Sequence, residues 1–172
     1  MLKAIGSCLI LFAGITWGFQ MKQNLSNNLR HLINLQEMIL MLSSEITYGR
    51  VPLKEAFLRI SELQKEPFSS LLKDVVQDME TEKGQTLWEI WKCAIQKNKS
   101  RICFSKEEFL ILEELGENLG CLDVVMQKNH MALYEQQIQL RIHRAEKELA
   151  TKQKMYQYLG VLSGLFLILL LV

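Results

Sequence analysis

The final residues, KMYQYLGVLSGLFLILLLV, constrain this chain most, because the stretch GLFLILLLV at their end is apolar on every side of any helix that it forms. Residues 159–172 are all uncharged and would make about 21 Å of helix. Residues 155–158 extend the uncharged run to about 27 Å, close to the ~30 Å hydrocarbon core of a bilayer. A helix that is apolar all round finds no equally apolar partner in this sequence except the first segment. We therefore expect a transmembrane helix over residues 155–172.

The first 21 residues form a second apolar segment, in which Lys3 is the only charged residue. A cleaved signal peptide looks similar, and that alternative stays open. However, no A-x-A-like cleavage site follows the apolar run, and Trp17 and Phe19 are typical of aromatic anchors at a membrane interface. We expect a retained transmembrane segment over residues 1–21.

The residues between these ends carry almost all of the charge. Of the 20 Lys and Arg residues only Lys3 lies outside residues 22–157, and all 19 Asp and Glu residues lie inside them. This region is long enough for one modest core, and its balanced charge excludes the basic face that a nucleic-acid-binding protein needs. The sequence predicts one central domain, residues 22–154, with no nucleic-acid partner.

The basic residues next to the two apolar segments predict the orientation of this domain. Cytoplasmic loops of membrane proteins carry an excess of Lys and Arg. The far side of the membrane would hold at most Lys3, so the central domain is expected in the cytoplasm. The basic residues on the domain side are Lys22, Arg30, Arg141, Arg144, Lys147, Lys152 and Lys154.

Apolar spacing and helix-breaking residues divide the central domain into helices. Apolar residues from Leu32 to Ile46 repeat at steps of three and four, and Gly49 closes this helix. Pro52 and Pro67 each open a further helix, because proline is tolerated in a first turn. Alternating β-branched runs are absent, so no sheet is expected.

Two capping boxes open the next helices, Thr86-x-x-Glu89 and Ser105-x-x-Glu108. From Asp123 to Leu159 the chain has neither Gly nor Pro, which predicts one long helix running from the domain into the membrane. The fold class is therefore all-α, a bundle of about six helices with an apolar segment at each end.

The long helix carries a narrow apolar stripe. Such a stripe packs against one partner, which is either the preceding helices of the same chain or a helix of another subunit. The stripe consists of Met131, Tyr134, Ile138, Ile142, Ala145, Leu149 and Tyr156.

Residues that carry chemistry do not gather in a recognised pattern. The three histidines have no metal-ligand spacing and are expected to be exposed. Gly116-x-x-x-Gly120 lacks the lysine of a phosphate-binding loop. We predict no enzyme, no metal and no cofactor. The histidines are His31, His130 and His143, and the acidic cluster expected on a solvated face is Glu107, Glu108, Glu113, Glu114 and Glu117.

One stretch is unusual for a plain helical bundle, residues 114–127, which we call the second corner; the connection that holds Glu45, Tyr48 and Arg50 is the first corner. In the second corner Gly116 and Gly120 stand four residues apart and close to Asp123. This spacing predicts a tight turn, where backbones approach closely or φ is positive.

The second corner also supports a resemblance to known proteins. Its run Gly116-Glu117-Asn118-Leu119-Gly120-Cys121-Leu122 is similar to a corner of the type II secretion F-type inner-membrane platform proteins. Over nearly its whole length the sequence resembles the stage III sporulation protein AB family of endospore-forming bacteria. The matching stretches are Met1-Leu2-Lys3-x-Ile5-Gly6, Glu45-Ile46-x-Tyr48-Gly49-Arg50-x-Pro52-Leu53-x-Glu55-Ala56, Leu119-Gly120-x-x-Asp123 and Lys154-x-Tyr156-x-x-Leu159-Gly160-x-Leu162-x-Gly164-Leu165.

The resemblance implies a non-enzymatic component of the channel-like complex between mother cell and forespore. It would lie in the mother-cell membrane around the forespore, in contact with lipid, beside a secretion-type ATPase and ring-forming proteins. The secretion F proteins generally carry two helical domains and three spans, whereas this chain has one domain and two segments. That difference favours self-association into a homo-oligomer or a simpler scaffold role.

We therefore expect a membrane platform whose bundle contacts an ATPase or a ring protein. A membrane-anchored regulator or adaptor that signals through its long C-terminal helix is the alternative. Capping and tight turns alone would also select the residues of both corners. The candidate contact residues are Glu45, Tyr48 and Arg50 in the first corner and Glu117, Gly120 and Asp123 in the second.

Overall fold

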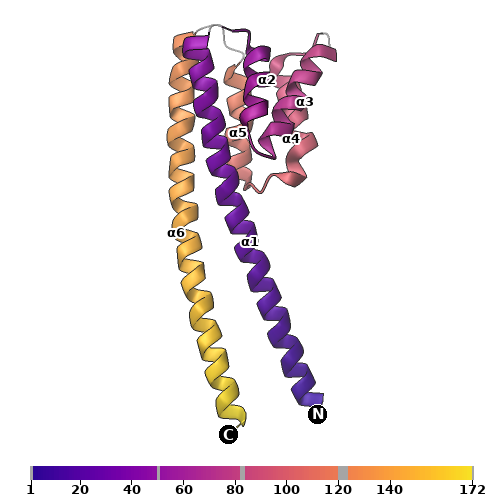
Figure 1. The fold of residues 1–172 in the computed structure, drawn as a ribbon, viewed down its shortest axis with the longest axis vertical. Coiled ribbons are helices and arrows are strands. Elements are labelled where there is room, and N and C mark those ends of the chain that lie inside the picture. The colour runs from indigo at the N-terminus through magenta and orange to yellow at the C-terminus, as the bar shows by residue number, and fades with distance from the viewer. Residues whose placement is uncertain (1, 50, 82–83, 120–123, 172) are drawn as a thin grey trace. The chain divides into compact units, whose positions relative to one another are not determined.

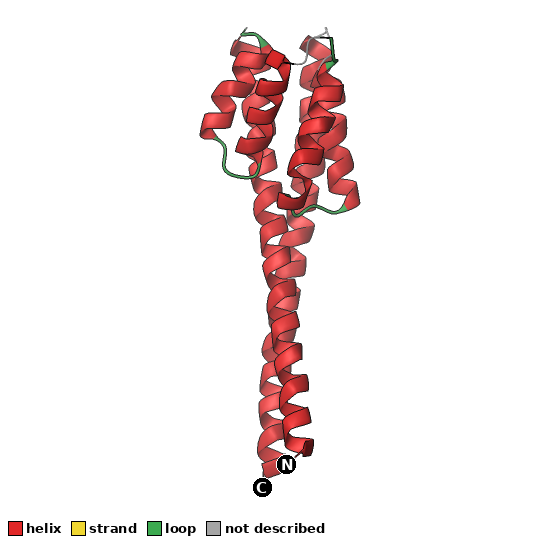
Figure 2. Ribbon diagram, turned by 90° about the vertical axis from the view of Figure 1, so that its right-hand side faces the viewer, coloured by secondary structure: helices red, strands yellow, loops and turns green. Residues whose placement is uncertain are grey.

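The computed structural model describes the backbone of residues 2–49, 51–81, 84–119 and 124–171, and side chains over residues 20, 22–47, 51–81, 84–119, 126–152 and 155. In these ranges every regular element is a helix, as Figure 2 shows. The prediction of an all-α fold with about six helices is confirmed. The elements are α1 (Leu2–Ser44), η1 (Glu45–Gly49), α2 (Leu53–Leu63), α3 (Phe68–Thr81), α4 (Leu87–Asn98), η2 (Lys99–Arg101), α5 (Lys106–Leu119) and α6 (Val124–Leu171) (Figure 1).

The chain divides into two compact units. The bundle unit comprises Arg30–Ile142, and the terminal unit comprises Met1–Leu29 together with His143–Val172. In the terminal unit the start of α1 and the end of α6 lie at the same end, as Figure 1 shows. Among the described residues, no helix is long and apolar enough to span a bilayer. The domain limits predicted at residues 21 and 154 stay predictions.

Helix boundaries in the bundle unit follow local signals. The α-helical part of α1 ends at Ser44, and one π-helical turn, η1, carries the chain to Gly49, the predicted end of the first helix. Pro52 caps α2 with an extended backbone, at φ −54° and ψ 141°. Its carbonyl oxygen accepts hydrogen bonds from the backbone N–H groups of Glu55 and Ala56, at 2.9 and 3.1 Å. The proline predicted to open the second helix is therefore confirmed.

Both predicted capping boxes are present. At α4 the Glu89 N–H donates to Thr86 Oγ1 (3.3 Å), and the Thr86 N–H donates to Glu89 Oε2 (2.8 Å). The bond that the Thr86 N–H donates to the exposed Glu89 carboxylate, and after it the bond that the Thr86 hydroxyl donates, lower the pKa of this carboxyl. At α5 the Ser105 N–H donates to Glu108 Oε2 at 2.7 Å, and the Glu108 N–H donates to Ser105 Oγ at 3.3 Å. Each box satisfies two backbone donors that a helix start leaves unpaired.

The apolar stripe of α6 packs inside the chain. Within the bundle unit Met131, Tyr134, Ile138 and Ile142 are all buried, and Ala145 is buried in the terminal unit. The intramolecular alternative is thus confirmed for these residues. Leu149 is half-buried, and the side chain of Tyr156 lies outside the described residues.

An indole ring packed on a glycine joins α4 to α5. Trp91 is fully buried, and its Nε1–H donates to the carbonyl oxygen of Leu112 at 2.8 Å. A Cβ atom placed on Gly116 would overlap Cδ1, Cγ and Nε1 of this ring. Gly116 therefore lies within α5 to admit a side chain, and the prediction that it forms a tight turn is wrong. Among the described glycines, the positive φ belongs to Gly84, at 110°.

We expect Gly116→Ala to destabilise the bundle by about 1–3 kcal/mol, because the new methyl group overpacks the site of Trp91. On an open helix surface the same change would stabilise by up to ~1 kcal/mol, because alanine is the better helix former. Urea unfolding of the purified chain in mild detergent, followed by circular dichroism, measures the difference.

Two controls separate overpacking from other causes. Glu117→Ala, at the next and exposed position of α5, should leave stability nearly unchanged. In a Trp91→Ala background the methyl group finds space, so Gly116→Ala should then cost much less. A Gly116→Ala chain as stable as the unsubstituted one would contradict this account.

Candidate interaction sites

The first corner joins α1 to α2 through the π-helical turn η1. Glu45 opens this turn and is half-buried. Tyr48 has a helical backbone, but its side chain lies outside the described residues, as does the whole of Arg50. A π-helical turn often occurs at a functional site. The role of these three residues in contact with a partner stays a prediction.

The second corner joins α5 to α6. Glu117 is exposed in the last turn of α5, whereas Gly120 and Asp123 lie outside the described residues. The structure therefore places one of the three predicted contact residues of this corner, on a solvent-facing surface.

Hydrogen bonds tie the end of α5 to the start of α6. The Asn118 side-chain amide donates to Tyr134 Oη at 2.6 Å and to the Glu114 carbonyl oxygen at 2.9 Å. The Gln127 amide donates to the Leu119 carbonyl oxygen, at 2.6 Å. The Gln127 bond satisfies a carbonyl that the end of α5 leaves unpaired, and the bonds from Asn118 to Tyr134 and from Gln127 to Leu119 fix the two helices on either side of the corner.

The acidic face of α5 differs in one member from the prediction. Glu108 is buried, with 6% of its surface exposed, because it turns back to cap its own helix at Ser105. Its predicted place on the solvated face is wrong. Glu113 is half-buried, while Glu107, Glu114 and Glu117 are exposed around the exposed Leu110.

His31 is a buried structural residue, and its predicted exposure is wrong. It is 5% exposed, and its Nδ1 accepts a hydrogen bond from the Cys103 N–H at 3.0 Å. Its ring meets that of Phe104 edge to face, with centroids 6.4 Å apart. The signal was present in its spacing, because His31 stands four residues before the buried Leu35 on the same helix face.

The environment of His31 favours its neutral form. Burial lowers the pKa of the imidazole below 6.5, and the charge of Arg30 lowers it further. Because a backbone N–H donates to Nδ1, that nitrogen carries no proton, and the neutral ring holds its proton on Nε2. The ring thereby joins α1 to the segment before α5.

The other two histidines have separate environments. His130 is half-buried and stacks on Tyr134, with ring centroids 6.4 Å apart, so its predicted exposure is only partial. His143 is exposed, as predicted, and its Nδ1 lies 3.1 Å from Glu146 Oε2. Among the described residues no group of three or more His, Cys, Asp or Glu side chains could hold a metal ion.

Comparison with known proteins supports the family resemblance over almost the whole chain. The family described as stage III sporulation protein AB matches residues 3–172. A relative, the stage III sporulation protein AB of Bacillus subtilis (strain 168), is 31% identical over 173 residues, which cover 99% of each chain. A solved structure of a stage III sporulation protein AB, 23% identical, matches 72% of this chain and 97% of its own with a TM-score of 0.67. That structure supports the fold of the bundle.

We expect the chain to lose stability as the pH falls below about 6.5, because the unfolded state then binds the proton that buried His31 resists. The folded pKa of His31 lies below its unfolded value, so this contribution is complete above pH 6.5 and is lost on acidification. His31→Asn keeps an acceptor near the position of Nδ1 but does not titrate.

Urea unfolding of both chains at several pH values between about 8 and 5 tests this expectation. The His31→Asn chain should be less stable at high pH, because it loses the ring contact with Phe104, but it should depend less steeply on pH. Equal pH dependence of the two chains would contradict the proposed state of His31.

Proposed function

Because the chain belongs to the stage III sporulation protein AB family, we propose that it is a non-enzymatic platform subunit of the channel-like complex between mother cell and forespore. The two apolar ends anchor it in the mother-cell membrane around the forespore. The bundle faces the cytoplasm and contacts a secretion-type ATPase or a ring-forming protein.

The continuity of α1 and α6 carries this proposal. α1 runs unbroken over Leu2–Ser44, and α6 runs unbroken over Val124–Leu171. Each helix therefore contains both residues that are buried in the bundle core and one of the two apolar terminal segments. This architecture suits a protein that holds a recognition domain at a membrane.

Charge supports the orientation. Lys22, Arg144 and Lys147 are exposed on α1 and α6, beside the two apolar ends. Such residues concentrate on the cytoplasmic side of membrane proteins.

Glu117 is the best-placed candidate for the contact with a partner. It is exposed on the acidic face of α5, near Glu114 and the exposed Leu110. An apolar side chain ringed by carboxylates suits a partner surface that pairs an apolar residue with basic ones. Glu45 in the first corner is half-buried, so it offers less surface to a partner.

The test is to purify the tagged chain from membranes of sporulating cells in mild detergent and to determine what accompanies it. We expect an assembly that contains the ATPase and other double-membrane components. A lone monomer or dimer that survives gentle extraction would contradict the platform role and favour a membrane-anchored regulator.

A charge reversal distinguishes partner contact from a structural role of the second corner. Glu117→Lys should remove or weaken the ATPase in the purified assembly while it leaves the stability of the chain unchanged, because Glu117 is exposed. Gln77→Lys, at an exposed position on α3, is the matched control and should keep the full assembly. Loss of stability in Glu117→Lys, or full retention of the ATPase, would contradict the assignment.

A further inference from the structure

Two helices of the bundle unit expose apolar side chains at a spacing of seven residues. On α1 these are Ile33 and Leu40, which we call the α1 strip. On α6 they are Met126, Leu133 and Leu140, the α6 strip. Their exposed fractions run from 38% for Ile33 to 54% for Leu140. Seven residues make two helical turns, so each strip lies along one face of its helix.

Both strips lie away from the core of the bundle. On α6 the buried positions are Met131, Tyr134, Ile138 and Ile142, which fall on the other side of the helix from Leu133 and Leu140. The strips are therefore not used by the packing that holds α6 in the bundle. Aligned apolar side chains that are left half-exposed in this way mark an interaction surface.

The contact between α1 and α6 inside one chain sets their alignment. The two helices run antiparallel, as Figure 1 shows, and the Gln36 side-chain amide donates to Gln139 Oε1. Both glutamines lie in the bundle unit. They define which residues of the two helices stand at the same level.

The two strips match each other in this same alignment. Relative to the level of the glutamine pair, Leu140 is displaced by one residue, about 1.5 Å, toward the C-terminal end of α6. Ile33 is displaced in the same direction by three residues of α1, about 4.5 Å. In the other direction Leu133 lies about 9 Å and Leu40 about 6 Å from that level. In each apolar pair, Leu140 with Ile33 and Leu133 with Leu40, the two residues thus differ in level by the same ~3 Å. A shift of one helix by that distance along its axis brings both pairs level together.

We propose that the α6 strip of one copy packs against the α1 strip of a second copy of this chain. Leu140 then meets Ile33 of the neighbouring copy, and Leu133 meets its Leu40. In this head-to-tail contact each copy uses its α6 strip on one neighbour and its α1 strip on another, so the contact repeats from copy to copy and closes into a ring where the rotation allows.

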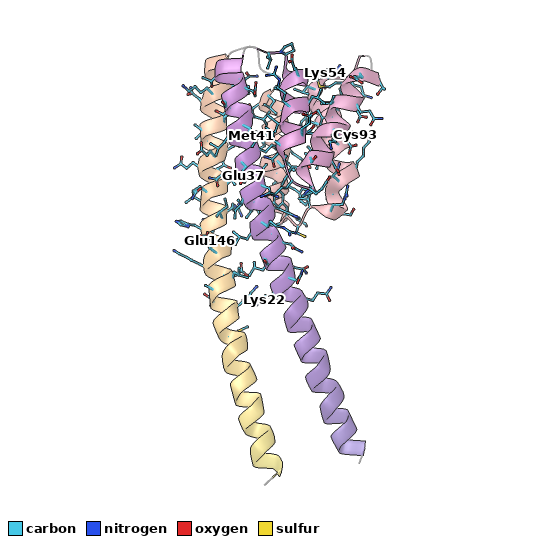
Figure 3. The ribbon with its side chains drawn as sticks, in the orientation of Figure 1. Lys22, Glu37, Met41, Lys54, Cys93 and Glu146 are labelled. Carbon is cyan, nitrogen blue, oxygen red and sulfur yellow. The ribbon has the colours of Figure 1, made fainter. Side chains whose placement is uncertain are left out.

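The charge of Glu37 and the burial of both apolar strips favour a second copy bound head-to-tail over a two-fold contact between like strips. The exposed Glu37 stands between Ile33 and Leu40 on α1 (Figure 3). Two α1 strips face to face would bring two Glu37 carboxylates together, which costs free energy. In the head-to-tail contact Glu37 instead faces the exposed amides of Gln136 and Gln137. This contact also covers both strips, whereas a two-fold contact between like strips leaves the other strip of each copy in solvent.

The contact is small and depends on a high local concentration. Five half-exposed side chains bury less than the roughly 1,200 Å² of a stable standard interface. The inference therefore rests on the proposed function, in which anchoring in one membrane concentrates and aligns the copies.

Pairwise disulfide cross-linking of full-length chains tests the contact. In chains whose native cysteines are replaced by serine, one copy carries Ile33→Cys and a differently tagged copy carries Leu140→Cys. Both are reconstituted into phospholipid vesicles and oxidised with copper phenanthroline, which accepts the electrons as the disulfide forms. We expect a mixed dimer, several-fold more abundant than with the matched surface pair Gln77→Cys and Lys92→Cys.

The other outcomes overturn the proposal. Leu140→Cys chains that link only to each other would show a two-fold contact through α6. A mixed dimer no more abundant than the Gln77→Cys and Lys92→Cys product would show random collision. A chain that carries both Ile33→Cys and Leu140→Cys should give a ladder of higher multimers, and its absence contradicts repetition.

Vesicle flotation separates this inference from the proposed function. A chain that does not float with vesicles contradicts membrane anchoring, and the same cross-linking in concentrated detergent solution then still decides the contact. A chain that floats and accompanies the ATPase, but gives no mixed dimer, contradicts only the head-to-tail contact.

Discussion

The bundle depends on one contact more than on any other, the indole of Trp91 lying against Gly116. Because the glycine has no side chain, the ring can reach the Leu112 carbonyl oxygen and satisfy its only donor in the core. The ring also meets that of Phe57 of α2, with centroids 5.9 Å apart. One side chain thereby holds α2, α4 and α5 together, and a methyl group at Gly116 would displace it.

A second group of aromatic contacts connects α1, α3 and α5 within the bundle unit. Phe68 of α3 packs on Phe104, with centroids 6.0 Å apart, and Phe104 packs on both His31 and Phe109. The connection between η2 and α5 is thus held by rings from α1, α3 and α5, while the Cys103 N–H is fixed by His31. Polar ties such as Asn118 to Tyr134 then place α6 on this framework.

Features that depend on neighbouring residues could be predicted from the sequence. The boxes that begin at Thr86 and Ser105 and the unbroken α6 follow from residues within a few positions of one another. Gly116 and His31 were placed incorrectly, because their roles depend on Trp91 and Cys103, which are distant in sequence. The stripe of α6 showed that a partner helix exists but not to which chain it belongs, since apolar spacing is the same in both cases.

The candidate site was less predictable than the fold. An exposed residue such as Glu117 is fixed by no packing within its own chain, so its role depends on a partner that the sequence does not contain. The exposed strips of α1 and α6 were hidden for another reason. Their seven-residue spacing appears only after the buried positions of the same helices are known, because both sets alternate along one sequence.

The central claim is that two membrane anchors hold a cytoplasmic bundle. The most direct measurement uses Cys93, which is exposed on α4 (Figure 3), as the sole cysteine in a functional chain. Sporulating cells are treated with a membrane-impermeant maleimide before and after permeabilisation, and their membranes are washed with alkaline carbonate. The account predicts that Cys93 reacts only after permeabilisation and that the chain stays in the washed membranes. Reaction in intact cells, or release by carbonate, would contradict it.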